Sequence, residues 1–360
     1  MLRDVLVRRT KLFQEGLRKE GIDIAVIRAL STFTYFTGVR WLRPALIIPA
    51  EGDVRVFVVR GESELFMEKS WIRDVREFDE VSRLMAMISS SIKEFKAKTV
   101  GLEFTVERDA YILFYEMFKK INPNVQIKDV HPLTMKLRMI KDNYEIENIK
   151  QAGKKAAKGL KAGLDIVKNG ASETEIASTI LTELIRIGCE EPKVYVNIGP
   201  HPRVHAEPFK DIIVKDNVFV TIVVAADYNN YYANTSRSIF NGKPNELAEK
   251  AIKCIDEAYS VAVEMSKINT TFINVQKSLD KIYEKYGLIN YRLIGYTHGI
   301  GLLVEEDPIT TIIPQHRGLI IMENMALAMV HTPLMIKGLG TVKREDTFIV
   351  GSNKLESTTQ

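Results

Sequence analysis

The strongest constraint on the fold is a pair of apolar runs in the middle of the chain, VFVTIVVA and YYANTSRSIF. The polar segment of residues 227–230 separates them. Two runs of this kind around a short polar turn predict two strands that pair with each other. We therefore expect a sheet to organise the part of the chain that contains residues 218–240.

A different pattern comes before this segment. Strand-like runs lie at residues 22–27, on both sides of Gly52 and at TVGLEF, with helical runs between them. Strands that alternate with helices predict a small α/β domain, which we place at residues 1–130. No cluster of potentially catalytic side chains occurs in it.

The remaining residues, 131–360, predict an α+β domain with helices on one side of a curved sheet. One long helix is expected to begin at Asp142 as N-cap, and another at Ser172, with Glu175 in capping-box spacing. Two further helices follow the paired strands, and four short strand-like pieces close the chain. The tail NKLESTTQ is expected to be frayed.

Composition excludes several functions. The 50 basic and 46 acidic residues are interspersed, which is typical of a solvated surface and argues against nucleic-acid binding. No apolar run reaches the roughly 18 residues of a membrane helix. The two cysteines match no disulfide or zinc spacing, so we predict a cytoplasmic protein with no membrane partner.

Two groups of residues could carry chemistry. His201 and His205 lie in the loop GPHPRVHAEP, and loops on a rigid scaffold often hold binding groups, although a solvated turn is the alternative for His201. His298 in THGIG, Glu323 in IIMEN and Glu345 in VKRED form a plausible ligand set for Mn, Fe, Co or Zn. The alternative is that lysine or arginine, with Arg237 and Arg344 as candidates, neutralises the two carboxylates.

These motifs occur in an order that resembles the pita-bread peptidase family, which includes prolidase, aminopeptidase P, methionine aminopeptidase and the metal-free creatinase branch. The matching segments are GPHPRVHAEP, residues 218–240, GYTHGIGLLVEEDP, GLIIMEN and GTVKREDTFIV. DIAVIRALSTFTYFTG is similar to the N-terminal domain of prolidases and creatinases. The resemblance implies a pita-bread C-terminal domain, of the creatinase/aminopeptidase-like α+β class, behind a smaller α/β domain.

Family peptidases hold two metal ions with two Asp, one His and two Glu. The resemblance matches the His and the two Glu to His298, Glu323 and Glu345. The two Asp positions hold Val223 and Asn234, which implies that the two-metal centre is lost and that no ion, or one divalent ion (Mn, Co, Zn or Fe), remains.

The resemblance also implies roles around the metal position. His205 matches the loop histidine that acts near the substrate or, in the creatinase branch, as catalytic base. His201, Arg237 and Glu305 are expected to contact substrate, with Glu305 standing where the family has a histidine.

The first functional hypothesis is a prolidase-like protein, of the Xaa-Pro dipeptidase family, whose two-metal peptidase activity is lost or altered. The alternatives are a working Xaa-Pro dipeptidase with a single ion, a metal-independent C–N hydrolase that uses His205, and a non-catalytic binding protein. In each case we expect a small peptide or another small C–N compound as ligand and, from the resemblance, a homodimer.

Overall fold

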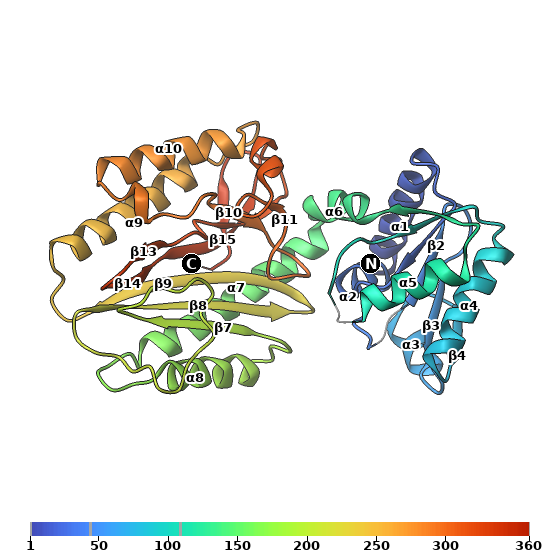
Figure 1. Ribbon diagram of the computed structural model, residues 1–360, viewed down its shortest axis with the longest axis horizontal. Coiled ribbons are helices and arrows are strands. Elements are labelled where there is room, and N and C mark those ends of the chain that lie inside the picture. The colour runs from blue at the N-terminus through green and yellow to red at the C-terminus, as the bar shows by residue number, and fades with distance from the viewer. Residues whose placement is uncertain (1, 43–44, 108–109, 360) are drawn as a thin grey trace. The chain divides into compact units, whose positions relative to one another are not determined.

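The computed structural model describes residues 2–42, 45–107 and 110–359, and the chain divides into two compact units, Met1–Arg138 and Met139–Gln360 (Figure 1). The sequence placed the boundary at residue 130, just ahead of helix α6 (His131–Met139). Among the described residues, no helix is both long enough and apolar enough to cross a membrane.

The first unit is built on a six-stranded mixed sheet in the order β4-β3-β2-β1-β5-β6. Its strands are β1 (Ile24–Ile27), β2 (Ala45–Pro49), β3 (Arg55–Val59), β4 (Asp74–Phe78), β5 (Thr99–Leu102) and β6 (Gln126–Asp129). Its other helices are α1 (Leu2–Lys19), α2 (Leu30–Thr37), α3 (Ser63–Lys69), α4 (Val81–Glu94) and α5 (Tyr111–Ile121). Strands β4 and β6 are the two that the sequence pattern missed, because few of their residues are buried.

The second unit is built on an eight-stranded sheet, in which seven strands follow the order β11-β10-β12-β15-β9-β8-β7 and β16 pairs with β15. Its strands are β7 (Lys193–Ile198), β8 (Val218–Tyr228), β9 (Tyr231–Asn241), β10 (Thr297–Gly299), β11 (Glu306–Ile309), β12 (Ala326–Met329), β15 (Arg344–Val350) and β16 (Leu355–Ser357). A separate two-stranded sheet consists of β13 (Leu334–Ile336) and β14 (Gly340–Val342).

Helices cover this sheet through two apolar cores. Helices α7 (Asn143–Leu164) and α8 (Glu173–Arg186) pack on β7 and β8, and α9 (Glu246–Met265) and α10 (Phe272–Lys285) pack with β12 and β15. Short 3-10 helices lie at Ile289–Tyr291 and Pro314–Gly318. The expected starts of the first two helices are confirmed, since Asp142 and Ser172 each form a complete capping box.

The central hairpin is also confirmed, and β8 and β9 pair over their whole length. Asn229 and Asn230 turn the chain with φ of 48° and 70°, values that asparagine tolerates in a tight hairpin turn. The expected fraying of the tail is wrong for the described residues. Thr358 N donates to Thr347 O (2.9 Å) and Thr359 Oγ1 to Asp346 Oδ1 (2.7 Å), while Gln360 lies outside the described residues.

Candidate active site

Strand register places the candidate residues on one face of the large sheet. Val223 pairs with Ser236 between β8 and β9, and Ser236 pairs with Glu345 between β9 and β15. Directly opposed residues of antiparallel strands point to the same face, and so do residues two apart on one strand. Asn234, two positions before Ser236 on β9, therefore shares this face with Val223 and Glu345.

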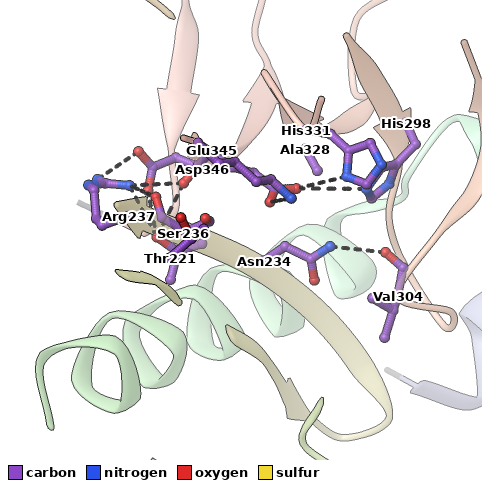
Figure 2. A network of polar contacts seen from close by, with 12 residues as sticks. Thr221, Asn234, Ser236, Arg237, His298, Val304, Ala328, His331, Glu345 and Asp346 are labelled. Atoms are coloured by element: carbon purple, nitrogen blue, oxygen red, sulfur yellow. Dashed lines mark hydrogen bonds and ion pairs between the residues drawn. The ribbon is translucent and has the colours of Figure 1, made fainter. Parts of the chain in front are cut away.

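His298 lies on the same face of the sheet, on strand β10, which is on the opposite side of β15 from β8 and β9 in the strand order. It pairs with Ala328 between β10 and β12, and Ala328 pairs with Thr347, two residues after Glu345 on β15. Residues far apart in the sequence thus converge, because strands β8, β9, β15 and β10 of the order β10-β12-β15-β9-β8 turn these side chains to one side. Figure 2 shows Asn234, Glu345 and His298 of this group.

A cavity of about 150 Å³ opens on this face. Its lining combines a cation, two carboxylates, three histidines and apolar side chains: Tyr195, His205, Val223, Ala225, Asn234, His298, Val304, Glu305, His331, Lys343 and Glu345. This mixture of titratable groups in a concave site is typical of binding and catalysis.

Two imidazoles face the Glu345 carboxylate. Glu345 Oε1 lies 3.8 Å from His298 Nε2 and 3.6 Å from His331 Nδ1, and all three residues are buried. His298 Nδ1 lies 2.8 Å from Gly299 O, which can only accept, so Nδ1 donates there and Nε2 is the nitrogen that faces the carboxylate. The three ligand atoms lie within 4.8 Å of one another, which is compact enough to surround one metal ion.

Lys343 also lies inside this cluster. Its Nζ is 2.8 Å from Glu345 Oε2, and the side chains of Lys343 and Glu345 are only 3% and 0% exposed. Burial alone would raise the pKa of Glu345, but the charge of Lys343 overrides burial and holds the pKa well below its usual range. Glu345 is therefore ionised at neutral pH, with a lysine ammonium as its counter-charge.

Two of the histidines around this pair, His331 and His205, have a lowered pKa. Burial, followed by the charge of Lys343, lowers the pKa of His331 well below its ordinary value. His205 as a residue is exposed, but its ring packs between those of Tyr195 and His331, with centroids 5.6 Å and 4.8 Å away. Burial of the ring and the charge of Lys343 lower the pKa of His205 to about 4.

The loop that carries His205 is held firmly against the sheet. Val196 N donates to Ala206 O (3.0 Å). Arg203 N donates to Thr341 Oγ1 (3.0 Å), whose hydroxyl donates back to Arg203 O (3.1 Å). His205 itself has a φ of 45°, a left-handed conformation that few residues other than glycine adopt. The surrounding bonds therefore fix an unusual backbone that turns the imidazole into the cavity.

Several residues predicted from the sequence lie outside the cavity. Glu323, expected to be a metal ligand, is exposed in the turn before β12 and does not reach the cluster, so this assignment is corrected. His201 is exposed, and only its carbonyl is engaged, by Asn197 Nδ2 at 3.0 Å. Arg237 pairs with Asp346 at 2.8 Å, and it does not line the cavity as a substrate-binding residue would.

The cation that neutralises Glu345 also differs from the arginines named as candidates from the sequence. Arg344 pairs with Asp256 at 2.7 Å, which leaves Lys343 as the cation beside Glu345. The sequence prediction left a lysine counter-charge open without identifying Lys343, and it missed His331. His331 follows the buried run ALAMV, whose first four residues form β12, and a histidine just after a buried strand was a signal that could have replaced Glu323.

Both units of the chain match known protein families. The model of metallopeptidase family M24 matches residues 147–352, more than half of the chain, and the creatinase/prolidase N-terminal domain matches residues 9–140. The chain belongs to the M24 metallopeptidase family. Its second unit has the pita-bread fold of that family, behind a creatinase/prolidase-type N-terminal domain.

Individual relatives agree over nearly the full length. The Xaa-Pro dipeptidase of Pyrococcus furiosus is 27% identical over 340 residues, which cover 93% of this chain and 92% of the relative. The Xaa-Pro dipeptidase of Pyrococcus horikoshii is 26% identical over 361 residues, covering 99% and 98%. The structure of the prolidase from P. horikoshii OT3 superposes with a TM-score of 0.88 at 25% identity, covering 98% of each chain.

M24 peptidases use divalent metal ions, and the residues of this site fit a pair of ions poorly. Val223 has no ligand atom, Asn234 offers only a neutral amide oxygen, and the Lys343 ammonium lies against the Glu345 carboxylate. The cluster of His298, His331 and Glu345 does fit a single ion, which would compete with Lys343 for Glu345.

Proposed function

We propose that this protein is a prolidase-like member of the M24 family in which the two-metal peptidase reaction is lost or altered. The observation that carries the proposal is the buried ion pair between Lys343 and Glu345. A two-metal hydrolase depends on its ions to polarise the scissile carbonyl and to lower the pKa of the attacking water. Here a fixed side-chain cation neutralises the carboxylate that would otherwise balance a metal charge.

The ligand class follows from the family. The relatives are named as Xaa-Pro dipeptidases, so we infer that the cavity takes a small peptide or another small C–N compound. A volume of about 150 Å³ admits part of such a molecule at the cluster. A homodimer in the cytoplasm is also part of the proposal, to be checked by light scattering and by fractionation of cells.

The experiment is a metal analysis of protein purified without chelator, combined with Xaa-Pro dipeptide turnover in added Mn, Co or Zn. We expect at most one ion per chain and turnover far below that of the Pyrococcus furiosus enzyme assayed in parallel. Two tightly bound ions per chain with metal-dependent cleavage would refute the proposal.

Reconstruction of the ligand set is the matching positive test. The variant Val223→Asp/Asn234→Asp keeps Lys343 against Glu345, so we expect it to recover little activity. Adding His331→Glu and Lys343→Met supplies another carboxylate beside Glu345 and removes the ammonium, and we expect a second ion to bind. Recovery by the first two substitutions alone would show that Lys343 does not block the site.

A second candidate is a dipeptidase that uses one metal ion. The observation in its favour is the presentation of His298 Nε2 beside His331 and Glu345. A set with two imidazoles and one carboxylate suits Zn, Co or Fe, and also Mn less strongly. Dipeptide turnover that is abolished by chelator and restored by one equivalent of metal would favour this candidate.

A further inference from the structure

Four buried side-chain oxygen atoms of the cavity wall accept no hydrogen bond within the described structure: Asn234 Oδ1, Glu305 Oε1 and both oxygens of Glu345. The Glu345 oxygens lie within ion-pair distance of Lys343 and the two histidines, which leaves Asn234 Oδ1 and Glu305 Oε1 without any partner. Buried polar atoms are almost always satisfied, so two bare acceptors on one cavity call for a common explanation. Both side chains line the same space of about 150 Å³, which also contains the Glu345 carboxylate.

The orientation of the Asn234 amide, which belongs to the cavity lining, is fixed by its neighbours. Its Nδ2 donates to Val304 O at 3.2 Å, and rotating the amide by half a turn would set two oxygens against each other (Figure 2). The backbone beneath it is equally fixed, since Asn234 N donates to Thr347 Oγ1 at 2.8 Å and Thr347 Oγ1 donates to Asn234 O at 2.9 Å. Oδ1 is therefore a positioned acceptor.

Glu305 adds an unbalanced negative charge. The one lysine of the cavity lining, Lys343, is already paired with Glu345, and Glu305 has no ion-pair partner among the residues that the structure describes. Val304, which receives the Asn234 amide, is the preceding residue, so Asn234 and Glu305 meet the cavity from adjoining positions. Together they offer two acceptors and one net negative charge.

We propose that this cavity binds the free ammonium group of a small peptide or amine, held between Asn234 Oδ1 and Glu305 Oε1. An ammonium group has three donors and one positive charge, which satisfy two acceptors and compensate one carboxylate. The inference rests on the proposed function, because a two-metal centre would occupy the same space.

The test is calorimetric titration of the full chain in excess chelator with Ala-Pro, its N-acetyl derivative and butylamine. We expect Ala-Pro and butylamine to bind, and acetylation to weaken binding of the dipeptide about tenfold or more, since it removes the charge and two donors. Equal affinity for Ala-Pro and its acetylated form, or binding of neither amine at millimolar concentration, would overturn the proposal.

Substitutions of Asn234 and Glu305 test whether each side chain accepts a hydrogen bond from the ammonium group. Glu305→Gln and Asn234→Leu should each weaken Ala-Pro binding about tenfold, whereas Asn234→Asp should tighten it because a second charge faces the ammonium. Glu264→Gln, on the exposed side of α9, is the control for a general loss of charge. Thermal unfolding of each variant identifies any that are misfolded, and an Asn234→Asp variant that folds but binds less tightly would contradict the assignment. Since chelator is present throughout, amine binding is judged separately from the metal count that tests the proposed function.

Discussion

Replacement of Lys343 by methionine tests whether a lysine ammonium has taken over the charge balance of the site. Methionine keeps an unbranched apolar side chain of similar length, so the packing of the cavity wall changes little. The ammonium 2.8 Å from Glu345 Oε2 is removed, and the carboxylate stays 0% exposed. Removing one partner of a buried ion pair costs about 3–5 kcal/mol of unfolding free energy.

The pH dependence has a definite sign. In the natural protein the pKa of Glu345 is held below its usual range, so its contribution to stability is present above the unfolded pKa and is lost as the pH falls. Without Lys343, burial dominates and raises the pKa, so the folded variant takes up a proton. The deficit relative to the natural protein should be largest at neutral pH and should shrink below about pH 4.

Urea denaturation of the two proteins at neutral and acid pH measures this difference. The control is Lys337→Met, which replaces an exposed lysine six positions before Lys343 in the sequence. The double variant Lys343→Met/Glu345→Gln should recover much of the loss, because no buried charge remains. Saturating zinc should stabilise Lys343→Met more than the natural protein, by about 3 kcal/mol at a hundredfold excess over Kd. If Lys343→Met and Lys337→Met are equally stable at neutral pH, the reasoning is refuted.

Three further predictions use other groups. Any turnover that survives chelator should disappear in His205→Ala. Because the pKa of the His205 imidazole is lowered to about 4, this turnover should decline near pH 4 and not near pH 6.5. A midpoint near pH 6.5 would contradict the burial of the ring. In the first unit, burial raises the pKa of Glu103 to about 8, so the cost of its ionisation to folding grows as the pH rises from about 4.5 to 8. Glu103→Gln should therefore raise the free energy of unfolding by at most about 5 kcal/mol at pH 8 and by little at pH 4. Urea denaturation at the two pH values measures this difference. Asp142→Ala should lower stability by about 1 kcal/mol through loss of the α7 cap, and an unchanged denaturation midpoint would contradict the capping role.

Much of the fold could be predicted because it depends on local patterns. The capping residues Asp142 and Ser172 and the turn at Asn229–Asn230 act on backbone groups a few residues away, so their spacing was sufficient. Strand β4 was missed because only one of its five residues is buried, which leaves no strong apolar period to detect.

The site was predicted only in part. Val223, Asn234, His205, His298, Glu305 and Glu345 do line one cavity, whereas Glu323, His201 and Arg237 do not. Glu323 looked buried because it interrupts an apolar run, but the turn that begins β12 points it outward. A run of apolar residues in the sequence does not show whether a charged side chain in the adjoining turn points into the core or into solvent.

The sequence by itself determined that the chain has a helix-capped sheet with a long central hairpin, a local property that can be read from neighbouring residues. That Val223 and Asn234 stand at the positions of the acidic metal ligands was implied only by the resemblance to the family. Only the tertiary structure decided that His331 completes the cluster and that Lys343 neutralises Glu345. These partners come from separate strands, and which charges meet in a buried cavity depends on strand register across the sheet, which spacing along the chain does not specify.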